Sequence, residues 1–164
     1  MYATIIYYSY HKETVLSKLL FIKFYQRLIN DAFAIIEDTN IAFDSLLEAM
    51  SDYAPEDKRL AWEPEMQGKH VHFLDLWIKI DIDHLSTSMF QKPANLYLYC
   101  CPFSAQLPYI LYGLIYGTMH RYYWHNTSIK DFDTLTKLLF NRLTDRTHRA
   151  QELAPLFIKA AQEI

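Results

Sequence analysis

The spacing of apolar residues changes once along this chain, and that change most constrains its fold. From Leu107 onward, apolar residues recur every three or four positions, which is the period of an α-helix packed through one face. Ser128 and Asp131 match the capping box of a second helix, and a third helix is expected to start near Arg149. The first of these helices would pack through Ile110, Leu111, Leu114, Ile115 and Met119.

The residues before this point are typical of a β-hairpin followed by a helix. Phe21–Asn30 has a β-rich composition and is followed by Asp31 and the apolar run Ala32–Ile36. Asn and Asp tolerate the left-handed backbone of a tight two-residue turn, so we expect a hairpin with its turn at Asn30-Asp31. A helix capped by Asn40 should follow, with an apolar face made of Phe43, Leu46, Leu47 and Met50.

Three further strands are expected between residues 60 and 90. They are Leu60–Glu65, Val71–Ile82 and Leu85–Phe90, and the first two are joined by a turn at residues 66–69. Alternation along the second strand would place His72 and Trp77 on opposite faces of the sheet.

The predicted fold class is therefore α+β. A small antiparallel sheet, with a hairpin near 21–36 and strands near 60–90, is followed by a three-helix, helix-turn-helix-like unit. Lys92-Pro93 should end the sheet because proline lacks a backbone donor. We expect residues 1–93 to form one part and residues 94–164 the other.

Composition narrows the class of protein. Apolar residues make up 51% of the chain, and 3 glycines and 6 prolines are few, which excludes a disordered or collagen-like chain. Residues 1–83 hold 8 Lys/Arg against 14 Asp/Glu, a net of −6, whereas residues 84–164 hold 8 against 5, a net of +3. This asymmetry fits a metal-using site joined to a polyanion-binding module, and an ordinary solvated surface explains it about as often.

Cysteine usage and hydropathy bear on the compartment. Cys100 and Cys101 are adjacent, a spacing unsuited to an ordinary disulfide, so we expect an intracellular protein, nuclear or cytoplasmic. The first residues show no secretory leader pattern. Ala94–Met119 holds no charged residue, but prolines interrupt it and leave only Leu107–Gly117, which is too short to cross a bilayer. We therefore expect no membrane partner.

Three polar residues in the predicted sheet have alternative interpretations. His70 and His72 alternate on one strand and could together touch a metal, but no third ligand has suitable spacing, so we expect them on a sheet face. Asp75 lies within an otherwise apolar run. It is either a partnered acid beneath a primer-holding hairpin or part of the polar face of an edge strand.

Arg27-Leu28-Ile29-Asn30-Asp31 resembles the catalytic turn of reverse transcriptases, in the Arg-Phe-Ile-Asp-Asp form found in Penelope-like retroelements. Downstream, residues 60–80 with their Phe-Leu-Asp signature, and then the Lys92-Pro93 pair, resemble the sheet that follows the catalytic turn. The last helices resemble the helix-turn-helix unit, or thumb, that follows the palm. The resemblance implies a fragment of an RNA-directed DNA polymerase that runs from palm to thumb, with RNA template and DNA primer as the partners of the intact relative.

Two departures from the family bear on catalysis. The family adds nucleotides by a two-metal reaction in which carboxylates hold Mg²⁺, and Asn30 stands where the resemblance requires the key aspartate. Asp31 remains as a relic of the acidic turn and the candidate metal ligand. The strand that carries the other metal-binding aspartate would precede Met1. We therefore expect no polymerase activity from this chain alone, and a partner that supplies the missing half remains an alternative.

Nucleic-acid binding is the role expected to survive. The candidate contacts are four basic residues: Lys92, Arg121, Arg142 and Arg149. Tyr122-Tyr123-Trp124 could stack on bases, although consecutive helical residues point in different directions and at least one must face the core. The alternative is a non-enzymatic protein-interaction or self-associating domain with an exposed aromatic surface.

Overall fold

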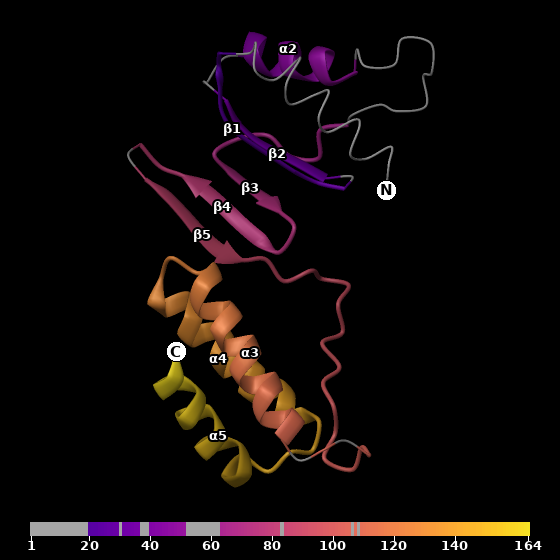
Figure 1. The fold of residues 1–164 in the computed structure, drawn as a ribbon, viewed down its shortest axis with the longest axis vertical. Coiled ribbons are helices and arrows are strands. Elements are labelled where there is room, and N and C mark those ends of the chain that lie inside the picture. The colour runs from indigo at the N-terminus through magenta and orange to yellow at the C-terminus, as the bar shows by residue number, and fades with distance from the viewer. Residues whose placement is uncertain are drawn as a thin grey trace. The chain divides into compact units, whose positions relative to one another are not determined.

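A computed structural model describes residues 20–29, 31–36, 40–51, 63–82, 84–105, 107 and 109–164. The chain forms two compact units, Met1–Gln67 and Gly68–Ile164, and each is described by itself (Figure 1). Its β-sheets and C-terminal helices confirm the predicted α+β class.

The first unit contains the predicted hairpin. Strands β1 (Ile22–Leu28) and β2 (Asp31–Ile36) pair antiparallel, and Leu28 faces Asp31 across a two-residue loop. The turn predicted at Asn30-Asp31 is therefore placed one residue too late, because Asp31 already pairs within β2. Ile29 in that loop has a φ of 53°, the left-handed backbone that a tight hairpin needs. Helix α2 (Asn40–Ser51) follows as predicted and buries Leu46.

The second unit opens with a three-stranded antiparallel sheet of order β3-β4-β5. Its strands are β3 (His70–Phe73), β4 (Leu76–Ile80) and β5 (Leu85–Met89). The continuous strand expected over Val71–Ile82 is wrong, because the chain turns back at Leu74-Asp75, where Leu74 has a φ of 57°. Of the strand expected at Leu60–Glu65, residues 63–65 are irregular and the others lie outside the described residues.

The turn at Leu74-Asp75 changes which side chains share a face. His72 pairs with Trp77 across the hairpin, so the two lie on the same face instead of opposite faces. Their ring centroids are 5.4 Å apart, and His70 lies 4.5 Å from Trp77. Both histidines therefore lie on a sheet face against an aromatic ring, as expected.

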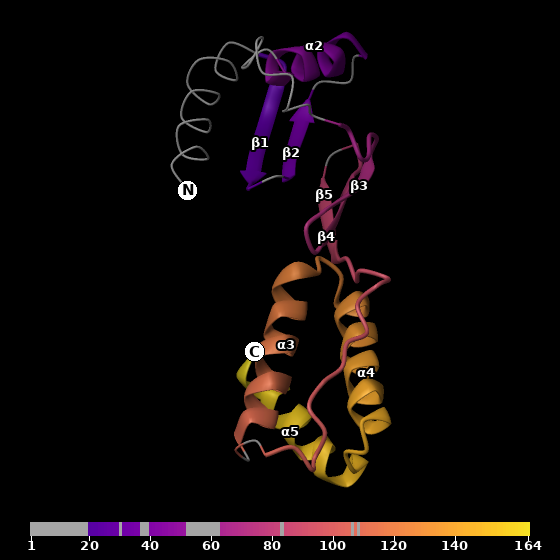
Figure 2. The same cartoon turned by 90° about the vertical axis from the view of Figure 1, so that its right-hand side faces the viewer.

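Three helices complete the second unit: α3 (Tyr109–His125), α4 (Ile129–Asp145) and α5 (Ala150–Glu163). Ser128 caps α4 by accepting from the Lys130 backbone N–H at 3.3 Å, in line with the predicted cap. The helices pack together (Figure 2) around a buried apolar cluster. Its members are Ile115, Met119, Tyr122, Leu139, Leu143, Leu153, Phe157 and Ala160.

Among the helices of the described residues, none combines the length and hydropathy that crossing a membrane requires.

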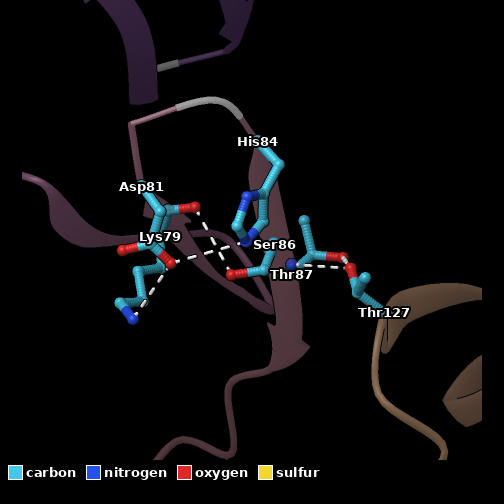
Figure 3. A network of polar contacts seen from close by, with 6 residues as sticks. All are labelled: Lys79, Asp81, His84, Ser86, Thr87 and Thr127. Carbon is cyan, nitrogen blue, oxygen red and sulfur yellow. Dashed lines mark hydrogen bonds and ion pairs between the residues drawn. The ribbon is translucent and has the colours of Figure 1, made fainter.

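Hydrogen bonds join the sheet to the helices. The backbone N–H of Thr127 donates to the Thr87 carbonyl at 2.8 Å, and the Thr87 N–H donates to the Thr127 hydroxyl at 2.9 Å (Figure 3). The Met89 N–H donates to the Asn126 side chain at 3.0 Å. The α3–α4 turn thus continues the edge of β5. The sheet and the helices therefore belong to one compact unit, which begins at Gly68. The sequence predicted a boundary near residue 93, between the sheet and the helices.

Replacing Leu139 by alanine should lower the free energy of unfolding by about 2–5 kcal/mol, because Leu139 is fully buried where the helices meet. Urea unfolding followed by circular dichroism measures this change. Leu138→Ala is the matched control, since Leu138 is partly exposed on the same helix. Equal losses in the two variants would contradict the packing described for α4.

Candidate nucleic-acid interface

The predicted catalytic turn is only partly described. Asn30 lies outside the described residues, and Asp31 is exposed at the start of β2. The loop is held in part by Arg27, whose Nε donates to the Ile29 carbonyl at 2.9 Å. In the described part of the chain, no group of three or more His, Cys, Asp or Glu residues is arranged to hold a metal ion. Asp31 therefore lies at the end of the hairpin, and the described residues supply no set of further metal ligands around it.

Arg142, a predicted nucleic-acid contact, is engaged inside the protein. Its Nη2 donates to the Gln91 side-chain oxygen at 2.7 Å, and its guanidinium lies 3.8 Å from the centre of the Tyr97 ring. Both partners belong to residues 91–101, which we call the strap and which lead from β5 toward α3. Arg142 thus contributes a hydrogen bond and a cation–π contact to the fold.

Two more basic side chains at the end of α4 hold the strap. Arg146 Nε donates to the Tyr99 carbonyl at 3.0 Å, and Nε2 of the buried His148 donates to the Cys100 carbonyl at 2.9 Å. From the sequence alone, such basic residues are candidates for phosphate contacts as much as for contacts within the fold. Spacing could not separate the roles, because a basic residue that binds a backbone carbonyl and one that faces solvent look the same in sequence.

The other predicted contacts are more accessible. Lys92 is exposed just after β5. The Arg149 side chain is 81% exposed at the start of α5 and lies 3.8 Å from Glu152. These two cations can reach a polyanion without disturbing the strap.

Arg121 forms an ion pair that crosses between elements. From α3, its Nη2 donates to the carboxylate of Asp75 in the β3–β4 turn. The side chains are 47% and 42% exposed, respectively, so solvent reaches both. Asp75 is therefore a partnered acid in a turn and not part of the face of an edge strand, and its place beneath a primer-holding hairpin stays a prediction.

The aromatic triplet near the end of α3 divides as helical geometry requires. Tyr122 is buried in the core cluster, and burial raises the pKa of its hydroxyl, with the neighbouring Tyr99 adding to the shift. Tyr123 is exposed, and Trp124 is 71% exposed. Trp124 is therefore the member of the triplet best placed to stack on a base.

A row of aromatic rings follows one side of α3. Tyr112, Tyr116, His120 and Trp124 are four residues apart, with successive ring centroids 6.2, 5.7 and 6.0 Å apart. We call this the α3 row. Trp124 Nε1 donates to His120 Nε2 at 3.1 Å, which orients the two exposed rings relative to each other. The i, i+4 spacing of these residues is present in the sequence. It does not stand out there, because the core residues of the same helix lie between the members of the row.

Two glycines lie beside the α3 row. A Cβ atom added to Gly113 or Gly117 would meet no atom within 4 Å, so the helix backbone is open to a ligand at both positions. The α3 row and these glycines together form the candidate interface. It offers flat ring faces and an unobstructed backbone within about four turns of one helix.

One end of the row is fixed by α5. The Tyr112 hydroxyl donates to Glu163 at 2.6 Å, and Lys159 lies 4.5 Å from the centre of the Tyr112 ring. The hydrogen bond to Glu163 is the main cause that raises the Tyr112 pKa from 10.0 to about 12. Tyr112 is thus an anchor for the helix pair, and Tyr116, His120 and Trp124 are the members left to meet a ligand.

Replacing Arg142 by methionine should speed amide exchange in the strap and lower the unfolding free energy by about 1–3 kcal/mol, because the Gln91 and Tyr97 contacts are lost. Hydrogen exchange with mass spectrometry measures the first effect and urea unfolding the second. Arg149→Met removes an equal charge from an exposed site and should change neither. Unaltered strap exchange in R142M would show that Arg142 does not hold the strap.

Raising the pH should weaken the Tyr112–Glu163 bond. Because the folded-state pKa is raised, the stabilisation from this bond is complete below pH 10.0 and is lost as the pH passes about 12. A ¹³C NMR titration of the tyrosine rings, with Tyr112→Phe to identify the signal, measures the shift. Glu163→Ala should return the Tyr112 pKa toward 10.0, and the control Glu152→Ala should not. An unshifted Tyr112 in the wild-type protein would contradict the geometry.

Comparison of the chain with protein-family models, with curated proteins and with solved structures found no match. Its function is therefore inferred from the residues and their geometry.

Proposed function

We propose that this chain is the palm-to-thumb part of an RNA-directed DNA polymerase and that the activity it retains is nucleic-acid binding. The order of elements supports the proposal: a tight hairpin, a helix, a small antiparallel sheet and a three-helix unit follow one another, as the resemblance implies. The two-residue loop of the hairpin also falls within the Arg27–Asp31 motif that carries the resemblance.

The observation that carries nucleic-acid binding is the exposed part of the α3 row next to the open backbone at Gly113 and Gly117. Every base has a π-face, so aromatic side chains bind bases without reading sequence, at about 1–3 kcal/mol per stacked base. The missing Cβ atoms let a sugar or phosphate approach the helix backbone closely. These features suit a chain that must follow a template regardless of its sequence.

Charge makes the smaller contribution to this interface. Residues 68–164 contain 10 Lys or Arg residues and 8 Asp or Glu residues, a net charge of only +2. Arg142 is engaged with the strap, which leaves Lys92, Arg121 and Arg149 as the predicted contacts that solvent reaches. Few phosphate contacts give a shallow salt dependence, and stacking must supply most of the affinity.

Nucleotide addition is outside this proposal. In the intact relative, Mg²⁺ would orient the primer hydroxyl and stabilise the leaving pyrophosphate. Among the described residues, Asp31 belongs to no group of three or more His, Cys, Asp or Glu residues that could hold a metal ion, and Asn30 in the sequence supplies no negative charge. The residues that the structure describes do not form a two-metal centre, so we derive no catalytic step.

A second candidate function is protein interaction. The strap and the turn after it expose large apolar side chains, with Leu96, Leu98 and Phe103 all turned to solvent. Such exposure suits a protein partner or self-association. The two functions differ in one measurable property, because affinity for a polyanion falls as salt rises and affinity through an apolar surface does not.

Replacing Trp124 by alanine should weaken binding to a fluorescent RNA–DNA hybrid with a single-stranded overhang by about 5- to 150-fold, the loss expected when one stacked base is no longer supported. Fluorescence anisotropy over a range of salt concentrations measures the affinity. Phe103→Ala is the matched control, because Phe103 is an exposed aromatic residue that is not part of the α3 row, and the substitution should leave the affinity unchanged. No binding by the wild-type protein at any salt concentration would refute the proposed function and favour the protein-interaction alternative.

A further inference from the structure

The ion pair between Asp75 and Arg121 lies beside the candidate interface. It joins the β3–β4 turn to α3, two elements that are 46 positions apart in the sequence. Solvent reaches both side chains, so the pair can open without exposing a buried charge. Exposed pairs of this kind contribute little to stability, which means that a competing anion can displace one partner.

Arg121 continues the open side of α3. Gly113, Gly117 and Arg121 are four residues apart and therefore lie on the same side of the helix, and Trp124 follows one turn later. A nucleic-acid strand that stacked on Trp124 and passed the two glycines would bring a phosphate to the Arg121 guanidinium. In the structure, that guanidinium is occupied by the Asp75 carboxylate.

We propose that Asp75 restrains nucleic-acid binding by holding Arg121 in this ion pair. The inference rests on the proposed function and adds its regulation. A bound phosphate replaces the Asp75 carboxylate as the partner of Arg121, and the free energy needed to break the pair is subtracted from the affinity. Asp75 therefore sets how tightly the surface binds and how readily it releases a strand.

Two other predicted nucleic-acid contacts, Arg142 and Arg149, are less suited to such a switch. Arg142 is held by Gln91 and by the Tyr97 ring, so its release would loosen the strap. Arg149 lies near Glu152 on its own helix, and this pair joins no separate elements. Arg121 differs from both. Its partner Asp75 lies on another element, and Arg121 can leave this partner to bind a phosphate without loosening the strap.

The carboxylate can be neutralised without removing the turn. The Asp75 carbonyl accepts from the Phe90 N–H at 2.8 Å, and this backbone bond does not depend on the side chain. Asparagine is isosteric with aspartate and equally common in turns. Asp75→Asn should therefore fold, and Asp75→Ser provides a second variant that removes the charge.

The matched control is Asp81→Asn. Asp81 lies at the other end of β4, its side chain is 41% exposed against 42% for Asp75, and it pairs with Lys79 at 3.2 Å (Figure 3). The substitution therefore changes the net charge by the same amount in the same sheet, but it leaves Arg121 paired.

Binding to a labelled oligo(dT) strand and to the RNA–DNA hybrid should be measured by anisotropy across salt concentrations. Asp75→Asn and Asp75→Ser should each tighten binding about two- to tenfold at low salt, because no ion pair then has to be broken before Arg121 meets a phosphate. The gain should shrink as salt rises, because salt screens the exposed pair in the wild-type protein. Asp81→Asn should change the affinity less than about twofold. Adding Arg121→Gln to either Asp75 variant should abolish the gain.

The outcomes separate this inference from the proposed function. Salt-dependent binding by the wild-type protein with no gain in the Asp75 variants would overturn the inference and leave the proposed function standing. An equal gain from Asp81→Asn, or a gain that survives Arg121→Gln, would also overturn it, since general charge would then be the cause. If neither the wild-type protein nor the Asp75 variants bind at any salt concentration, both proposals fail.

Discussion

Burial of the apolar cluster where α3, α4 and α5 meet is the constraint on which the second unit depends. Ile115, Met119 and Tyr122 of α3 are almost completely buried in it. A helix that buries one face in a core can no longer rotate about its axis. The same packing therefore decides which side chains the opposite face exposes to solvent. Gly113, Gly117 and Trp124 lie on that exposed face. The candidate interface is thus a consequence of core packing.

The basic residues of the second unit have different roles that depend on their neighbours. Arg142, Arg146 and His148 bind the strap through side-chain or carbonyl oxygens, which would lack partners if the strap packed without them. Arg121 is paired with an acid on another element, whereas Arg149 is largely exposed. A count of positive charges would overstate the capacity to bind phosphate. The exposed aromatic rings, which charge counting ignores, carry more of the argument for nucleic-acid binding.

Sequence reasoning predicted the hairpin, α2 and the three final helices because each has a strong local signal, such as a turn-forming pair, a cap or an apolar face. It missed the turn at Leu74-Asp75 for a physical reason. Leucine rarely adopts positive φ, and apolar residues flank the turn without glycine, asparagine or proline, so a single long strand was the natural prediction. The pairing of β4 with β5 on one side and β3 on the other stabilises a backbone conformation that the local sequence disfavours.

The sequence by itself determined the α+β class, the positions of most elements and the residues that could carry chemistry, since these depend on local propensity and on the period of apolar residues. Tertiary structure alone decided that Asp75 meets Arg121, that Arg142 serves the strap and that Trp124 rather than Tyr122 faces solvent. Each of these outcomes depends on contacts between residues distant in sequence or on the rotation of a helix about its axis. Packing sets both, and no window of neighbouring residues contains that information.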